Sequence, residues 1–294
     1  MALCTAGNGV GDMAKSKKAK AVRFAILCTL LFLFTQAAAG LIASLIISVA
    51  VSQEYGDTAH IQARVTEIVS SNLILIAIFG NLLFLAVVLL VARRHRTTPL
   101  STLRLHRAAA SQYLLPVLVI LFFSSSWNMA WEALPLPQRL MGNVTAIEQA
   151  AQGNMVLFFI AIAVIGPIAE EIAFRKIIMS RLRGVMPATP AIAINALLFG
   201  LTHGITGSVT TVVFAFIGGI IFALAYEKTG SVLVAVVTHT AGNLCDFVPR
   251  VSSALLPSVQ YVLIGVLMVC AVIAFMLLLK KPSGLVRRTP AVPG

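Results

Sequence analysis

Long apolar segments joined by short polar connections dominate the sequence. Hydrophobic residues make up 59% of the 294 residues and charged residues only 11%, whereas a soluble domain carries about 25% charged residues. Because about 20 apolar residues cross a bilayer as a helix, we predict an all-α polytopic membrane protein with about eight transmembrane helices. These helices are expected at residues 24–51, 68–92, 108–125, 155–183, 190–203, 209–226, 232–247 and 258–279.

The first apolar segment follows a basic run at residues 15–23, and three alanines stand at 37–39. This arrangement resembles a signal peptide with a small-residue cleavage site. The apolar run continues to Val51, however, which is too long for the core of a signal peptide. An uncleaved first transmembrane helix is therefore the preferred interpretation.

The net charge of +12 comes from 22 Lys and Arg against 10 Asp and Glu. Eighteen of the 22 basic residues fall at alternate ends of the expected helices, within residues 15–23, 93–107, 176–183, 228 and 280–288. Basic residues of membrane proteins concentrate on the cytoplasmic side, so we expect both termini in the cytoplasm. The lipid bilayer is the expected partner. Nucleic acid is not, since binding it requires a basic patch on a folded surface.

Three charged residues lie inside an apolar segment, where topology does not explain them. Glu170, Glu171 and Arg175 all fall within residues 155–183. Placing a charged side chain inside a membrane costs free energy, so such residues indicate a functional site by default. Of the five histidines, only His203 and His239 lie in apolar segments.

Helix geometry predicts that these residues converge. Glu170 precedes the turn at 184–187 by about 14 residues and His203 follows it by about 16, so at about 1.5 Å per residue both lie roughly 20–25 Å from that turn. His239 and Asn243 are four residues apart and share a helix face. The expected site is therefore formed by three helices at similar depth.

Each feature also has a purely structural interpretation. Glu171 and Arg175 can form an ion pair that makes burial tolerable, and an intramembrane histidine or Asn243 can hydrogen-bond between helices. Phe199 is expected to serve packing. Their joint occurrence at one depth favours a functional site over independent packing events.

A carboxylate facing a histidine can hold and deprotonate a water molecule. A second histidine and an asparagine can donate hydrogen bonds to an oxyanion. Together these groups suit hydrolysis of a peptide bond. The alternative is a zinc site formed by Glu170, His203 and His239 with water as the fourth ligand, although the sequence has no His-Glu-x-x-His motif. We therefore expect no cofactor, with zinc or another divalent metal as the alternative.

The three motifs together resemble the signature of the CPBP family, which includes type II CAAX prenyl proteases and bacteriocin-processing and self-immunity proteins. The resemblance covers about residues 155–247. It implies an eight-helix intramembrane endopeptidase that opens toward the cytoplasmic half. The motifs are Glu170–Glu171–x–x–x–Arg175, Phe199–x–x–x–His203 and His239–x–x–x–Asn243.

The resemblance also implies a role for each motif position. Glu170 and His203 would activate water, His239 and Asn243 would stabilise the oxyanion, and Glu171 and Arg175 would support the site. The substrate would be a membrane-associated protein or peptide, with a prenylated CAAX-type protein as one possibility. Members of the family have been described both as glutamate proteases and as metalloproteases, and the residues here favour the glutamate type.

We accordingly expect a basic cytoplasmic tail (1–23), three N-terminal helices with their loops (24–150), a CPBP-like catalytic core in helices 4–7 (151–250), and a last helix with a basic tail (251–294). The short loops and small membrane body are typical of a bacterial plasma-membrane protein. The alternatives to a protease are a non-catalytic scaffold or self-immunity protein and, less favoured, a proton-coupled transporter, which would more often show inverted repeats.

Overall fold

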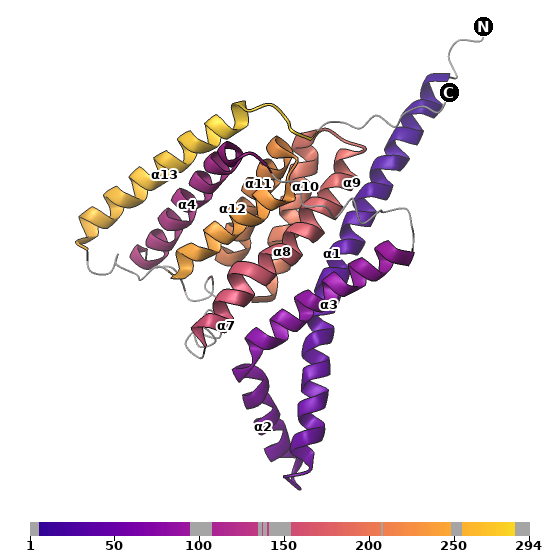
Figure 1. Cartoon of the computed structure of the whole chain (residues 1–294), viewed down its shortest axis with the longest axis vertical. Coiled ribbons are helices and arrows are strands. Elements are labelled where there is room, and N and C mark those ends of the chain that lie inside the picture. The colour runs from indigo at the N-terminus through magenta and orange to yellow at the C-terminus, as the bar shows by residue number, and fades with distance from the viewer. Residues whose placement is uncertain are drawn as a thin grey trace.

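The computed structural model describes residues 6–94, 108–134, 137, 140, 154–206, 208–247 and 255–285. Across these ranges every regular element is a helix (Figure 1), which confirms the all-α prediction. Seven helical segments are long and apolar enough to cross a membrane: Met13–Ser52, Leu73–Arg94, Ala110–Trp131, Met155–Arg183, Ala188–Ile205, Val209–Thr229 and Pro257–Lys280. The remaining expected segment, 232–247, is a shorter apolar helix, Val232–Leu244.

The first three helices differ from the expected segments. Helix α1 (Ala6–Ser52) begins within the expected basic tail and includes residues 15–23. The second segment is divided at Asn72 into α2 (Thr58–Ser71) and α3 (Leu73–Arg94). Figure 1 shows α2 and α3 folding back beside α1. The Asn72 backbone N–H bonds to Val69 O and thereby ends α2, so the membrane-crossing part begins later than the hydropathy indicates.

The remaining helices form a bundle that carries the predicted site. Helix α4 (Ala110–Ala133) packs against both α13 (Pro257–Lys280) and α12 (Val232–Leu244), and α10 (Ala188–Thr202) packs against α11 (Val209–Thr229). Helix α12 also contacts α11 and α8, so it lies within the bundle (Figure 1). Its 13 residues extend only about 20 Å.

The fourth span changes its helical register twice. A π-helix places one extra residue in a turn and is rare, and it is found mostly near functional sites. Two such segments interrupt this span, and the carboxylates Glu170 and Glu171 lie directly before the second π-helix. In order, the elements are α7 (Met155–Phe159), π-helix η2 (Ile160–Ile165), α8 (Gly166–Glu171), π-helix η3 (Ile172–Met179) and α9 (Ser180–Arg183).

Two glycines allow α10 and α11 to approach closely. A Cβ atom on Gly200 would lie 2.9 Å from Cβ of Phe216, and one on Gly219 would lie 3.1 Å from Cδ1 of Phe199. Small residues at helix contacts are a common basis of packing within membranes. At Gly219 the close approach brings the α11 backbone to the predicted site.

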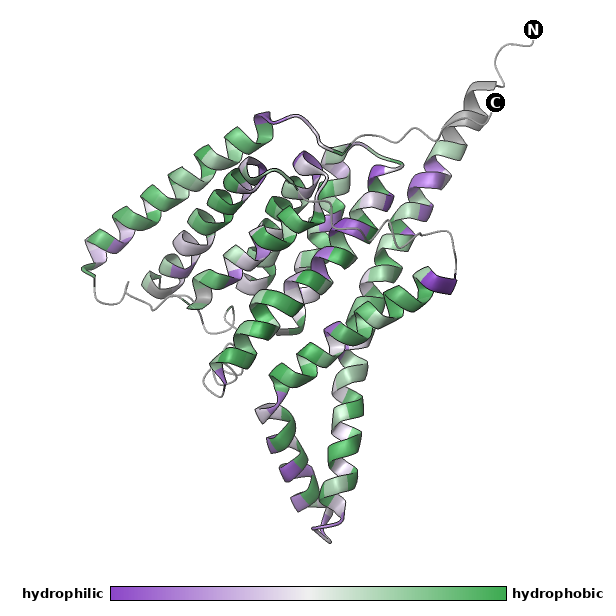
Figure 2. Ribbon diagram, viewed as in Figure 1, coloured by the Kyte–Doolittle hydropathy of each residue, from purple (hydrophilic) through white to green (hydrophobic). Residues whose placement is uncertain are grey.

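Several of the expected basic clusters meet at one end of the bundle. Arg183 at the end of α9 pairs with Glu227 near the end of α11, with Nε 2.8 Å from Oε2. Lys228 donates to Leu279 O near the end of α13, and Arg181 lies over the ring of Phe24 in α1. Figure 2 shows hydrophilic residues at several helix ends and hydrophobic residues along the helices. Residues 95–107 and 286–294 of the expected clusters lie outside the described residues.

Candidate active site

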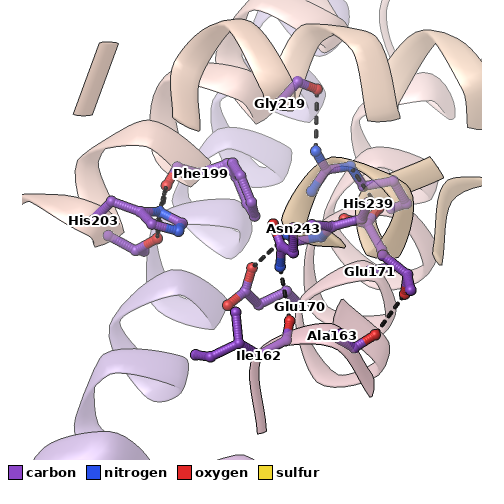
Figure 3. A network of polar contacts seen from close by, with 12 residues as sticks. Ile162, Ala163, Glu170, Glu171, Phe199, His203, Gly219, His239 and Asn243 are labelled. Atoms are coloured by element: carbon purple, nitrogen blue, oxygen red, sulfur yellow. Dashed lines mark hydrogen bonds and ion pairs between the residues drawn. The ribbon is translucent and has the colours of Figure 1, made fainter. Parts of the chain in front are cut away.

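The six predicted site residues come from neighbouring elements of the bundle. Helix α8 ends with both carboxylates, η3 carries Arg175, and α12 carries His239 and Asn243. His203 caps the C-terminal end of α10. Figure 3 shows Phe199 between His203 and the group formed by Glu170, His239 and Asn243. The expected core in helices 4–7 therefore does hold the site positions, whose catalytic roles remain predictions.

Arg175 and Glu171 form the most deeply buried part of the network, and both side chains have an exposed fraction of 0%. Arg175 Nε lies 3.0 Å from Glu171 Oε2, and Nη2 donates to Gly219 O at 3.1 Å. The guanidinium also lies 4.5 Å from the ring centroid of Phe199 and 5.3 Å from that of Phe222. A cation over aromatic faces gains about 2 kcal/mol when it is desolvated, which helps this charge remain buried.

His239 lies between the two carboxylates. Its Nδ1 is 3.0 Å from Glu171 Oε1, and its Nε2 is 3.8 Å from Glu170 Oε2. The imidazole stacks on Phe222 with ring centroids 4.4 Å apart. A carboxylate that accepts from one ring nitrogen fixes the tautomer and the ring orientation, so Glu171 directs Nε2 of His239 toward Glu170.

Glu170 differs from Glu171 in exposure and in bonding. Its side chain is 19% exposed, yet its Oε2 atom is buried and has no hydrogen-bond partner among the described residues. The 3.8 Å separation from His239 exceeds a hydrogen-bond length. A buried polar atom without a partner is costly, and such atoms call for an explanation such as a catalytic role.

His203 is half-buried and is oriented by its own helix. Its Nδ1 lies 3.0 Å from the backbone oxygen of Phe199. Because a carbonyl oxygen only accepts, Nδ1 carries the hydrogen, and Nε2 is the basic nitrogen of the neutral ring. The Phe199 ring lies 4.9 Å from the ring of His203 and 5.8 Å from that of His239, measured between centroids. Phe199 thus packs between the two imidazoles and against Arg175.

Asn243 and Thr240 join α12 to the fourth span. Asn243 Nδ2 donates to Ile162 O at 2.8 Å, and the Thr240 hydroxyl donates to Ala163 O at 2.7 Å. An amide nitrogen carries two hydrogens, so Asn243 can donate to a second acceptor while it holds Ile162.

The residues of the proposed metal alternative do not converge as a metal centre. Within the part of the chain that the structure describes, no group of three or more His, Cys, Asp or Glu is arranged to hold a metal ion. Both ring nitrogens of His239 face carboxylates rather than a point shared with His203. Within the described residues, the arrangement of Glu170, His203 and His239 therefore does not fit a three-ligand metal site.

Three residues of the site were not identified from the sequence. Gly219 provides the backbone acceptor for Arg175, Phe222 stacks on His239, and Thr240 binds the fourth span. Gly and Phe are common in apolar helices and carried no signal. Thr240 carried a weak one, since it is a polar residue between His239 and Asn243 in a mostly apolar helix.

A comparison with protein families supplies independent evidence. Residues 152–245 match the family described as type II CAAX prenyl endopeptidase Rce1-like. This part of the chain is similar to the Rce1-like family. The Rce1-like segment covers about a third of the chain and contains all three motifs, which confirms the resemblance to the CPBP family. No curated protein and no solved structure matched the chain. The match supports a protease of the CAAX endopeptidase type at the family level, and the seven apolar helices long enough to cross a membrane support an integral membrane protein.

Proposed function

We propose that the chain is an intramembrane endopeptidase of the glutamate type, which cleaves a peptide bond in a membrane-associated protein or peptide. The observation that carries this proposal is the pairing of the two carboxylates with His239. Glu171 is fully buried and bound to Arg175 and His239, whereas Glu170 is partly exposed and has a buried oxygen without a hydrogen-bond partner in the described part of the chain. One carboxylate is thus held by the protein, and the other is available to a water molecule and a substrate.

In the proposed reaction Glu170 removes a proton from water, assisted by the basic Nε2 of His203. The water oxygen then attacks the peptide carbonyl carbon. The negative charge that develops on the carbonyl oxygen accepts hydrogen bonds from the second amide hydrogen of Asn243 and from Nε2–H of His239, whose ring is doubly protonated in this step and keeps Nδ1–H on Glu171. When the C–N bond breaks, the proton held by Glu170 passes to the leaving nitrogen, which restores the carboxylate.

Glu171 and Arg175 act on the reaction through His239. Glu171 accepts from Nδ1 of His239 and keeps Nε2 directed toward Glu170. Arg175 balances the charge of Glu171 in a region where an unpaired carboxylate would be strongly destabilising. This arrangement supports a positioning role for the pair rather than direct contact with the substrate.

The proposed substrate is a membrane-bound polypeptide, with a prenylated CAAX-type protein as the first candidate because the matching family is described by that activity. We place the protein in a bacterial plasma membrane with both termini in the cytoplasm. The basic residues Arg181 and Arg183 of α9 and Lys228 of α11 lie at one end of the bundle, and Arg181 contacts Phe24 of α1 directly after the basic run at residues 15–23, which supports this orientation.

The proposal is tested by comparing cells that express the wild type with cells that express Glu170→Gln at equal levels. Mass spectrometry of peptide termini in their membranes should reveal new termini that require Glu170. The isosteric substitution keeps the packing and removes the base. Identical termini in both strains, together with an unchanged phenotype, would contradict the protease and favour a scaffold or self-immunity protein.

Metal dependence is tested on the purified protein in proteoliposomes. We expect cleavage to continue at an undiminished rate in the presence of a tight zinc chelator, since Glu170 and the histidines supply the base and the donors. Loss of activity on chelation, with recovery on addition of zinc, would replace this mechanism by the metal alternative.

A further inference from the structure

Pro167 interrupts the hydrogen bonding of the fourth span one turn before Glu170. A proline has no backbone N–H. In the π register of η2, where Gly166 N–H bonds to Ala161 O, the next donor would serve Ile162 O. In the α register, a donor at position 167 would serve Ala163 O. Because Pro167 has no N–H, either Ile162 O or Ala163 O lacks its backbone hydrogen bond, depending on whether the π or the α register continues.

Both of these carbonyl oxygens accept hydrogen bonds from side chains of α12. Asn243 Nδ2 donates to Ile162 O, and the Thr240 hydroxyl donates to Ala163 O. A proline within a membrane helix is tolerated when neighbouring side chains satisfy the freed backbone groups. The two donors of α12 thus replace what Pro167 lacks and connect the two helices that carry the site.

We propose that Thr240 is a positioning residue for peptide hydrolysis. Its hydroxyl fastens the η2–α8 junction to α12 and so sets the separation between Glu170 and His239. This inference rests on the proposed protease function. The motifs include Asn243 but not Thr240, so the Thr240 contact adds a residue to the site.

The contact acts at short range on both partners. Glu170 follows Pro167 by three residues in the six-residue helix α8, and His239 directly precedes Thr240. Displacement of the junction would therefore move the carboxylate relative to the imidazole, whose atoms are now 3.8 Å apart. Misplacement of reacting groups by about 1 Å can lower a rate by roughly 100-fold.

The first test compares Thr240→Val with Thr240→Ser in proteoliposomes, using a quenched fluorescent peptide that ends in an S-farnesylated CAAX sequence. The valine variant keeps the shape and removes the donor, and we expect kcat to fall by roughly 10- to 100-fold with KM nearly unchanged. The serine variant keeps the donor and should restore most of kcat.

Thr238→Val is the matched control. Thr238 lies on the same helix, is buried, and donates to Val234 O over the same 2.7 Å, but this bond remains within α12. Its loss should leave kcat within about twofold of the wild type, because it does not connect two helices. An equal loss of kcat in the Thr238→Val variant would show that any buried threonine of α12 matters, and would overturn the positioning role.

A double-mutant cycle tests the proposed link to Pro167. Pro167→Ala returns a backbone donor to the junction, so Thr240→Val should lower the unfolding midpoint and kcat much less in that background than in the wild type. Additive effects of the two substitutions would overturn the proposal. If the wild type does not cleave the peptide, the CAAX substrate fails, and the thermal cycle still decides whether Thr240 compensates for Pro167.

Discussion

Two Arg–Glu pairs lie on the fourth span and its neighbours, one largely buried and one fully buried, and they differ in how completely their hydrogen bonds are formed. In the first, Arg183 binds both carboxylate oxygens of Glu227 at 2.8 and 3.0 Å and also donates to Met186 O. Glu227 accepts a further bond from the Ser283 hydroxyl at 2.8 Å. This pair ties the end of α9 to α11 and to the segment after α13.

In the second pair, Arg175 Nε is 3.0 Å from Glu171 Oε2 but neither atom makes a well-oriented hydrogen bond within the described residues. Arg175 lies against the ring of Phe199, and Glu171 also holds His239. Fully satisfied polar networks stabilise a fold, whereas unsatisfied buried groups require another explanation. Under the proposed function, the Arg183 pair serves structure and the Arg175 pair serves the site.

The largest expected contrast comes from Arg175→Lys and Arg183→Lys. A lysine at 175 cannot bond to both Glu171 and Gly219 while it stacks on Phe199, because an ammonium lacks the planar fork of a guanidinium. We expect cleavage to fall by more than about tenfold and the unfolding midpoint to drop by several degrees. Arg183→Lys should lower the midpoint and leave the rate within about twofold.

Rates are measured in proteoliposomes and midpoints in detergent. Each rate is normalised to the amount of folded protein. If Arg183→Lys reduced the rate per folded molecule as much as Arg175→Lys, the distinction between a structural and a functional pair would be wrong.

A smaller contrast is expected between Phe199→Leu and Phe123→Leu. Both residues are buried, but Phe199 faces Arg175 and the two imidazoles, whereas Phe123 stacks on Phe214 at 5.4 Å. Both variants should lose about 1–2 kcal/mol of stability. Only Phe199→Leu should also slow cleavage, by roughly threefold to tenfold, because the cation–π contact between Arg175 and the ring at position 199 is lost.

Activity assays at saturating substrate, with circular dichroism as the check of folding, distinguish the two variants. Equal cleavage rates for both variants would show that Phe199 serves only packing, which is the role that the sequence alone indicates.

The smallest effect is expected for Ser283→Ala. The substitution removes one bond to Glu227, while both bonds from Arg183 remain. A loss of about 1 kcal/mol or less is expected, seen as a small fall in the unfolding midpoint with an unchanged cleavage rate. A marked loss of activity would mean that the satisfied pair also controls the site.

The helices and the site positions were predictable because of a strong physical constraint. Charges are rare in apolar spans, so Glu170, Glu171 and Arg175 stood out, and the spacing of His239 and Asn243 placed both on one face. Lengths of apolar runs located the spans, except where a local backbone bond at Asn72 divides the second segment.

The detailed contacts were not predictable, since they depend on register and on tertiary packing. The π-helices change the positions of Glu171 and Arg175 relative to those in an ideal α-helix, and no residue preference in the sequence predicts a π-helix. The role of Thr240 depends on which carbonyl oxygens of the fourth span lie beside α12. Sequence alone paired Glu170 with His203, whereas the contact that the structure shows for Glu170 is with His239, whose Nε2 lies 3.8 Å from Oε2.

The most direct test uses purified protein in proteoliposomes with a peptide substrate, comparing the wild type, Glu170→Gln and His203→Ala at equal amounts of folded protein. The account predicts that Glu170→Gln abolishes cleavage, that His203→Ala reduces it by roughly 100-fold or more, and that both keep the wild-type unfolding midpoint within a few degrees. Cleavage by Glu170→Gln at the wild-type rate would contradict the central claim that this carboxylate activates the water.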